Sequence, residues 1–327
     1  MRILVTGAGG FVGTVLVPLL ADRYGPAAVR LFVLPGERLP DEPPWPELAV
    51  FRGDIRMPES LRPAVSGCYV VVHLAGLISY RLCDRRRLFE VNARGAANVA
   101  RVCIETGVSR LVHFSSTGAI GFRRSRVPAT PATPYNWPGI FHYMASKRAG
   151  QEHVQRLCRK HGLDAVVLNP AAIMGPGDPN PESPHNRLYA LVSRARVMPT
   201  FTGGLAVVDV RDVAAIAAAA IEAAPPAEPC LLVGANVGYS DVLRSIAAAM
   251  GRRIRLIPVP AVLLAGTGLL LESLPEPPLT LAYGLMSGWH CYYDGESAAA
   301  HFRHTYRSFT QTVADACRYY TGRFASG

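Results

Sequence analysis

A glycine-rich turn close to the start of the chain sets the strongest limit on the fold. Residues 2–6 form a short apolar segment typical of a buried strand, and a helical pattern follows through Leu20. Between them, Gly7 permits a tight turn, Gly10 lets the backbone approach a phosphate group, and Gly13 lets the helix pack closely on the strand. A strand, a glycine turn and a helix in this order predict a site for the pyrophosphate of a dinucleotide rather than a purely structural turn.

Strands and helices alternate over the first half of the chain. Further strands are expected at residues 29–34, 48–51, 69–73, 111–115 and 165–168, and long helices at residues 88–106 and 143–161. This alternation predicts a protein of the α/β class, with a Rossmann-type, doubly wound parallel sheet that has helices on both faces.

The composition changes after residue 168, where proline, glycine and asparagine become frequent. We expect a Rossmann domain made of residues 1–168 plus about 205–235, and a smaller, discontinuous substrate-binding domain made of about 169–204 plus 236–327. Two later strands are expected to return to the main sheet, with an alanine-rich helix between them, at residues 207–209, 230–233 and 213–224. A cleft between the domains would lie over the carboxyl ends of the strands.

A tyrosine and a lysine lie four residues apart on the second long helix. At this spacing Tyr143 and Lys147 share a helix face, so that a phenol and an ammonium group can meet one ligand. The ammonium group is expected to lower the pKa of Tyr143, which makes the phenol a candidate proton donor to a carbonyl or acceptor from an alcohol. Lysine is rare here, with only Lys147 and Lys160 among 34 basic residues. The alternative is an ordinary exposed pair on a helix.

Two adjacent serines, Ser115 and Ser116, follow the predicted strand at residues 111–115. A hydroxyl at the end of this strand can donate a hydrogen bond to a reacting oxygen and place it near Tyr143. The alternative is a serine-rich turn between a strand and a loop.

Together these motifs resemble the extended short-chain dehydrogenase/reductase family, the NAD-dependent epimerase/dehydratase type, and within it the branch of dihydroflavonol reductases and 3β-hydroxysteroid dehydrogenases. Further matching segments are Gly53-Asp54-Ile55, His73-Leu74-Ala75-Gly76, Val91-Asn92, Asn169-Pro170, Gly175-Pro176 and residues 208–213. The resemblance implies that Ser116, with Ser115 as the alternative, acts with Tyr143 and Lys147 in catalysis. It also implies cofactor contacts from Gly7, Gly10, Phe11, Val12, Leu34, Arg38, Asp54, Ile55, Leu74, Ala75, Gly76, Asn92, Tyr143, Lys147, Pro170 and Ile173.

Departures from the family pattern narrow the expected reaction. Thr117-Gly118 stands where dehydratases carry an acidic pair, and Leu205-Ala206 stands where nucleotide-sugar epimerases usually carry Arg-Asp. We therefore expect an oxidoreductase that interconverts a secondary alcohol and a ketone by hydride transfer, with Tyr143 as general acid or base and Asn92 in a proton relay. The alternatives are a nucleotide-sugar epimerase with tightly bound NAD and a non-catalytic regulator that binds NAD(P).

The preferred cofactor, NAD(H) or NADP(H), stays open at this stage. A carboxylate after the second strand suits the ribose hydroxyls of NAD, whereas arginine suits the 2′-phosphate of NADP. This chain offers both, with Glu37 next to Arg38.

Composition excludes several other classes of function. The chain has 327 residues and a formal net charge of +10, but its arginines are scattered and no aromatic residues interleave with the dense run at Arg81 and residues 85–87. Nucleic-acid binding is therefore not expected. Seven cysteines without a CxxC pair indicate neither a disulfide framework nor a metal site. The sequence starts with a strand instead of a signal peptide, which predicts a cytoplasmic protein.

Residues 257–271 form the longest apolar run, which contains two prolines and two glycines. This run is too short to span a bilayer, so no stable membrane insertion is expected. It predicts a buried helix or part of an apolar wall for a hydrophobic substrate. The family resemblance also implies a homodimer, in which the helix at residues 88–106 and the Tyr143 helix form a four-helix interface.

Overall fold

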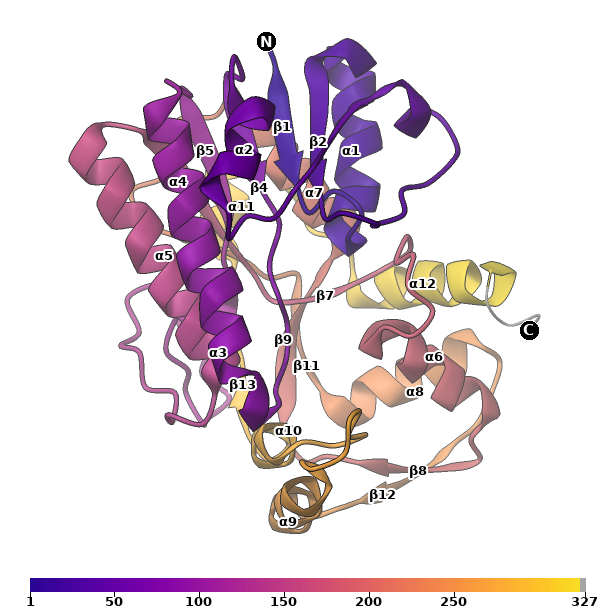
Figure 1. Cartoon of the computed structure of the whole chain (residues 1–327). Helices are drawn as coiled ribbons and strands as arrows, with labels where there is room; N and C mark the ends of the chain where they lie inside the picture. Colours follow the sequence, from indigo (N-terminus) through magenta and orange to yellow (C-terminus); the bar gives the residue numbers. More distant parts are fainter. Residues whose placement is uncertain (324–327) are drawn as a thin grey trace.

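The computed structural model describes residues 1–323. Its main sheet has seven parallel strands in the order β10-β6-β5-β4-β1-β2-β3 (Figure 1). The strands are β1 (Ile3–Thr6), β2 (Val29–Val33), β3 (Ala49–Arg52), β4 (Val70–His73), β5 (Arg110–Phe114), β6 (Asp164–Pro170) and β10 (Cys230–Leu232). The predicted Rossmann arrangement is confirmed, with strand ends shifted by one or two residues. The chain reverses direction along the sheet between β1 and β4, which is where such sheets bind ligands.

Helices cover both faces of this sheet because each buried strand directs apolar side chains to either side. Ile3 and Val5 belong to the core beneath α1 (Phe11–Tyr24) and α7 (Val210–Ala219). Leu4, between them, belongs to the core on the other face. That second core lies beneath α2 (Pro58–Val65), α4 (Ala96–Glu105) and α5 (His142–His161).

The helix expected at residues 88–106 is not a single regular helix. It consists of α3 (Arg85–Leu88), a wider π-helical segment η4 (Phe89–Gly95), and α4. Helix α5 crosses η4 so closely that a Cβ at Gly150 would lie 2.1 Å from the backbone oxygen of Asn92. A π-helical segment of this kind is common beside functional sites, and hydrophobic spacing alone does not reveal it.

A second sheet lies below the first in Figure 1 and corrects one expectation. It has the order β11-β9-β13, with β7 also paired to β9. Its strands are β7 (Ala172–Met174), β9 (Gly204–Asp209), β11 (Ala235–Gly238) and β13 (His290–Cys291). Residues 207–209 were expected in the main sheet, but only β10 returns there. Both sides of β9 are buried, with Val208 in one core and Val207 in another, so its apolar pattern does not distinguish between the sheets.

The remaining elements belong to the lower part of the molecule in Figure 1. Helices α6 (Pro184–Arg194), α8 (Tyr239–Ala249) and α12 (Phe309–Arg323) surround a third core. Strands β8 (Val197–Thr200) and β12 (Arg255–Pro258) form a two-stranded ribbon. Helices α9 (Ala261–Leu271) and α10 (Leu281–Met286) complete this part. Helix α11 (Glu296–Phe302) packs on β10 of the main sheet. Single helical turns occur at η1 (Pro26–Ala28), η2 (Trp45–Glu47), η3 (Leu82–Asp84) and η5 (Thr117–Ala119).

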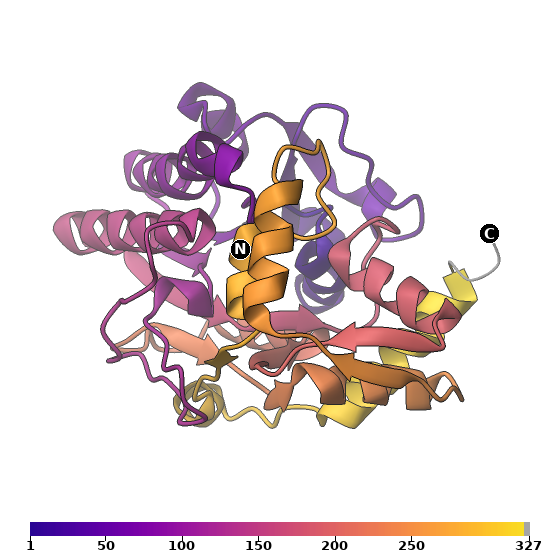
Figure 2. The same cartoon turned by 90° about the horizontal axis from the view of Figure 1, so that it is seen from below.

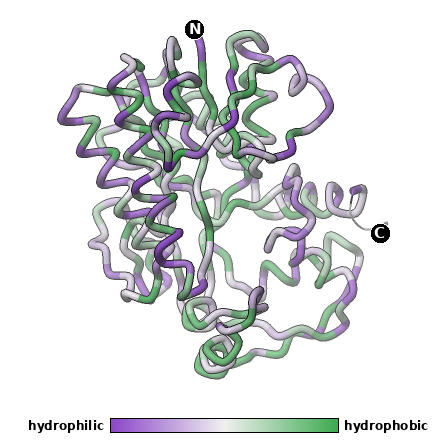
Figure 3. Tube along the Cα trace, in the orientation of Figure 1, coloured by the Kyte–Doolittle hydropathy of each residue, from purple (hydrophilic) through white to green (hydrophobic). Residues whose placement is uncertain are grey.

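The apolar run at residues 257–271 does not form a buried helix. Its helix α9 turns most of its surface away from the protein, as the exposed fractions of 76% for Val262 and 80% for Leu270 show. Only Ala265 and Gly268 of this helix are buried. Figure 3 shows α9 as a strongly apolar segment at the lower edge of the molecule. Within residues 1–323, no helix is long and apolar enough to cross a membrane.

Candidate functional site

The loops after the main-sheet strands carry most of the predicted site residues, and two of these loops touch at the β1–β4 switch point. Gly7, after β1, has a φ of +69°, a conformation that favours glycine. A Cβ at Gly7 would also lie 2.7 Å from the Cα of Ala75, after β4. Any side chain at Gly7 would therefore separate the two loops, and the predicted tight turn is confirmed.

The start of α1 fits the pyrophosphate group that the glycine motif implies. Gly10 immediately precedes α1, and within residues 1–323 no side chain caps the first N–H groups of the helix, which include those of Phe11 and Val12. A Cβ at Gly10 would meet only the oxygen of Gly7, at 3.3 Å, whereas a Cβ at Gly13 would lie 2.1 Å from the oxygen of Ala8. Gly13 is thus required for packing, while Gly10 leaves the end of the helix open to an anion.

Lys147 is buried next to the loop after β4. Its side chain extends from α5 across the end of β5, where Nζ donates a hydrogen bond of 2.8 Å to the backbone oxygen of Phe114. A Cβ at Gly76 would lie 3.6 Å from this Nζ, which places the amine directly beside the loop after β4. Burial lowers the pKa of Lys147 to about 8.

The side chains of Ser116 and Tyr143 lie close enough to interact. The Ser116 hydroxyl oxygen accepts a hydrogen bond from the backbone N–H of Gly118, at 3.1 Å. Burial raises the pKa of Tyr143 above its usual value, and the interaction with Ser116 acts in the opposite direction. The expected lowering of this pKa by Lys147 is therefore wrong, because burial dominates. Ser115 is buried and its hydroxyl has no partner in the described structure.

A layer of neutral histidines lies beneath Lys147, and sequence reasoning did not assign it a role. His73 and His113 are paired in register on β4 and β5, and their rings stack 5.3 Å apart. Thr6 Oγ1 lies 2.7 Å from His73 Nδ1. Burial, followed by the charge of Lys147, lowers the pKa of His73 to about 3. Burial, followed by the charges of His73 and Lys147, lowers the pKa of His113 as well. In the sequence, this pair could have been recognised from two histidines at corresponding positions of two otherwise apolar strands.

Amide side chains hold the site together from two sides. Asn92 accepts a hydrogen bond from the N–H of Leu77 (2.8 Å) and donates to the Leu77 oxygen (2.8 Å) and to Ser146 Oγ (3.0 Å). These contacts tie the loop after β4 to α5, and the proton relay stays a prediction for Asn92. Asn169, at the end of β6, donates to the backbone oxygen of Ser116 (2.7 Å) and to Gln151 of α5 (2.8 Å).

The turn after β2 holds a carboxylate against the glycine motif. Glu37 accepts a hydrogen bond of 2.9 Å from the N–H of Leu34, and a Cβ at Gly9 would lie 2.4 Å from Glu37 Oε1. Arg38 is exposed. Arg52 of β3 donates to the backbone oxygens of Leu34 and Glu37, at 3.3 and 2.9 Å. Glu37 and Arg38, the two candidates for recognition of the 2′ position of the cofactor, thus both follow β2.

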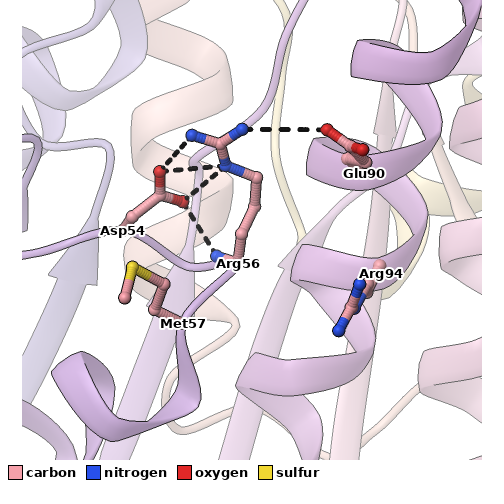
Figure 4. Close-up of a pocket in the computed structure, with 5 residues that line it drawn as sticks. All are labelled: Asp54, Arg56, Met57, Glu90 and Arg94. Atoms are coloured by element: carbon pink, nitrogen blue, oxygen red, sulfur yellow. Dashed lines mark hydrogen bonds and ion pairs between the residues drawn. The ribbon is translucent and has the colours of Figure 1, made fainter.

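Asp54 lines a surface pocket together with Arg56, Met57, Glu90 and Arg94 (Figure 4). The hydrogen bonds from Arg56 lower the pKa of the Asp54 carboxyl group. Figure 4 shows the Arg56 guanidinium between Asp54 and Glu90, which links the end of β3 to η4.

Ile55, also predicted at the cofactor site, is buried in the core beneath α4. A Cβ at Gly95 would lie 2.7 Å from its Cδ1. Contact of Asp54 and Ile55 with the cofactor stays a prediction.

The segment after β6 lies over the start of α1. Pro170 ends β6 and Ile173 lies in β7. Further along, Gly177 accepts a hydrogen bond of 2.8 Å from Thr14, and the ring of His185 lies 5.2 Å from that of Phe11. His185 was not predicted, because this contact joins segments far apart in the sequence.

Comparison with known proteins places this chain in a family. The family model described as "NAD dependent epimerase/dehydratase family" matches residues 3–232. The chain belongs to the NAD-dependent epimerase/dehydratase family. It is 32% identical over 284 residues to sterol demethylase protein B of Methylococcus capsulatus, a match that covers 84% of this chain and 82% of that protein. It is also 32% identical to ceramide reductase of Caulobacter vibrioides, with 81% and 76% covered.

Solved structures agree with this assignment. The crystal structure of gox2253 has a TM-score of 0.84 and 26% identity and covers 99% of this chain and 98% of its own. UDP-glucose 4-epimerase of Thermus thermophilus in complex with NAD has a TM-score of 0.78 at 23% identity, covers 99% of this chain and 100% of its own, and shares the fold. The chain is therefore an enzyme of a nicotinamide-dinucleotide-dependent family, and the glycine turn fits that cofactor.

Proposed function

We propose that this enzyme interconverts a secondary alcohol and a ketone, with Ser116, Tyr143 and Lys147 at the reacting centre. The observation that carries this proposal is the proximity of Ser116 and Tyr143, with Lys147 one helical turn further on and beside Gly76. A phenol and a serine hydroxyl that lie next to each other can both donate to one carbonyl oxygen.

The raised pKa of Tyr143 suits the reductive direction. A phenol that stays protonated at neutral pH can donate its proton to the oxygen of a carbonyl as that oxygen gains negative charge. Ser116 orients the same oxygen, and Asn169 fixes the backbone of Ser116. The bound cofactor supplies the hydride. Gly7, Gly10 and the start of α1 would hold its pyrophosphate, and Lys147 would donate to its nicotinamide ribose.

We propose a hydrophobic substrate, because aromatic rings line the approach to Tyr143. The ring of Tyr80 lies 5.6 Å from that of Tyr143 and 4.5 Å from that of Tyr283. The names of two relatives, sterol demethylase protein B and ceramide reductase, point to lipid-like substrates. At the position expected to grip a nucleotide diphosphate in an epimerase, Leu205 and Ala206 lie in β9 without a cationic side chain.

Incubation of the purified protein with NADH or NADPH and a panel of ketones and nucleotide sugars tests this function. We expect net cofactor oxidation with hydrophobic ketones, and at least ~100-fold slower turnover in Tyr143→Phe, because a general acid is lost. Cofactor affinity, measured by fluorescence titration, should stay the same in that variant. Isomerisation without net oxidation would favour the epimerase, and cofactor binding without either reaction would favour the regulator. Near-normal turnover of Tyr143→Phe would contradict the role of Tyr143.

A further inference from the structure

Helix α9 exposes large apolar side chains that its neighbours leave uncovered. Four of them form what we call the α9 face, namely Val262 (76% exposed), Leu263 (60%), Leu269 (56%) and Leu270 (80%). No charged residue occurs in Ala261–Leu271. An apolar surface of this kind on a folded protein marks an interaction site.

The α9 face is a consequence of how α9 packs on α10. A Cβ at Gly268 would lie 2.4 Å from the oxygen of Thr280, and a Cβ at Gly284 would lie 2.5 Å from the Cα of Ala265. Close approach through these small residues fixes one side of α9 against the protein and directs the leucines outward. In Figure 2 the two orange helices lie side by side at the front of the molecule.

A basic segment lies near the end of α9. Arg85 and Arg87 of α3 are exposed. Arg81, just before them, donates a hydrogen bond of 3.3 Å to the backbone oxygen of Leu274, which follows α9. The N–H of Leu82 donates to Glu272 at 3.3 Å, so this carboxylate is engaged within the protein. The turn η3, which leads into the basic helix α3, is thereby fixed beside the end of α9.

The ribbon that leads into α9 combines apolar and basic residues in the same way. Arg255 and Ile257 lie two residues apart on β12 and therefore project from one face of the ribbon, where both are exposed. Val197, the partner of Arg255 on β8, is 53% exposed. Arg253, just before β12, is exposed as well.

We propose that the α9 face docks on the surface of an anionic lipid bilayer. Its leucines would enter the boundary between headgroups and acyl chains, while the flanking arginines would bind lipid phosphates. The helix is too short to span the bilayer, so the association is peripheral. A second copy of the chain fits the surface less well, because a two-fold contact uses the same surface on both copies and so offers no anionic group to the arginines.

The position of the surface gives the docking a consequence for catalysis, and this step rests on the proposed function. Tyr283 belongs to α10, on which α9 packs, and the rings of Tyr283, Tyr80 and Tyr143 follow one another towards the reacting centre. A hydrophobic alcohol or ketone dissolved in the bilayer would therefore reach the enzyme near Tyr283 and pass along these rings towards Tyr143.

Sedimentation with phosphatidylcholine vesicles, with and without phosphatidylglycerol, tests the docking without cofactor or substrate. We expect binding to the anionic vesicles that weakens with added salt. Leu270→Glu should reduce the partition coefficient about tenfold or more, because a charge replaces a leucine that would enter the bilayer. The double variant Arg85→Glu/Arg87→Glu should reduce it about tenfold or more. Matched controls, Leu19→Glu on α1 and Arg159→Glu/Lys160→Glu at the far end of α5, should bind as the unchanged protein does.

Three results would overturn the docking proposal. These are a lack of binding to anionic vesicles, equal losses in the α9 and control variants, and a dimer in light scattering that Leu270→Glu converts to a monomer. Failure of the ketone panel with intact vesicle binding would contradict the proposed reaction and leave the docking in place.

Discussion

Lys147 shows how strongly one residue depends on its surroundings. Its side chain is 7% exposed, donates to the oxygen of Phe114, and lies directly beside Gly76 in the loop after β4. The chain uses arginine at nearly every other basic position. A compact ammonium group fits this confined position, whereas a planar guanidinium group does not.

Lys147→Arg is therefore expected to be nearly inactive, although the charge is kept. The wider guanidinium group should displace either the loop at Gly76 or the phenol of Tyr143, and a displacement of ~1 Å can cost about 100-fold in rate. The measurement is kcat at saturating cofactor, with Lys160→Arg, at the end of the same helix, as the control. Equal rates for wild type and Lys147→Arg would mean that any cation serves at this position.

Burial of Lys147 also predicts a dependence of stability on pH. Its pKa is about 8 in the folded protein and about 10.5 when unfolded, so between these values the unfolded chain binds a proton that the folded chain does not. The free energy of unfolding should consequently rise with pH across this window, by about 3 kcal/mol, relative to Lys147→Met. Urea unfolding of both proteins from pH 7 to pH 10 measures the difference. Parallel curves would show that Lys147 titrates normally.

The spacing of residues along the chain predicts some site residues but not others. Tyr143 and Lys147 were found because one helix turn brings them together, whatever the rest of the fold does. Tyr80 and Tyr283 meet only through the packing of a loop on α10, some two hundred residues further along the chain. The direction of the Tyr143 pKa shift was wrong for a related reason, because the sequence shows the neighbouring cation but not the burial.

At the scale of elements, different glycines of the turn after β1 serve folding and cofactor binding. A Cβ at Gly13 would overlap the backbone of Ala8, while a Cβ at Gly10 would only touch the oxygen of Gly7. A substitution at Gly13 should therefore affect stability, and one at Gly10 should affect cofactor binding.

Gly10→Val is expected to abolish cofactor binding while the protein stays folded. Its side chain would occupy the space at the open start of α1, where an anion would approach the N–H groups. Gly13→Val is the comparison, since it should lower the melting temperature instead. Fluorescence titration with NADH and NADPH, together with thermal unfolding, measures both effects. If folded Gly10→Val bound the cofactor with normal affinity, the glycine motif would have a structural role only.

The elements that were misassigned share one cause. Apolar patterns identified the α9 segment and β9 as regular elements, but not the surfaces that they contact. Residues 257–271 were expected to be buried because they are apolar, yet α9 has α10 on one side only. Similarly, β9 pairs with β11, β7 and β13 instead of entering the main sheet. Pairing partners are set by long-range packing, which local periodicity does not encode.

Across the whole molecule, the main sheet supplies the cofactor side of the site, and the lower elements in Figure 1 supply the aromatic residues that face it. The division into a Rossmann domain of residues 1–168 plus about 205–235 and a substrate-binding domain stays a prediction. Of the elements in residues 205–235, β10 belongs to the first sheet and α7 packs against α1 beneath that sheet. Strand β9, in contrast, belongs to the second sheet, where it pairs with β11. Location in the cytoplasm likewise stays a prediction.

The last prediction concerns the oligomer, and it depends on which face of the molecule is free. Helices α4 and α5 pack side by side, and among the described residues no large apolar side chain on either helix is strongly exposed. Small residues such as Ala149 of α5 are partly exposed there and would let two copies approach closely.

We expect a homodimer through this surface, and Ala149→Arg should convert it to a monomer, because a long charged side chain would separate the helices. Ala300→Arg, on exposed α11, is the matched control and should leave the dimer intact. Light scattering at micromolar concentration gives the mass of each protein. Leu270→Glu should also remain dimeric, since the α9 face is assigned to lipid and the α4–α5 surface to the second copy. A monomeric wild type would refute the dimer, and a dimer unaffected by Ala149→Arg would place its interface elsewhere.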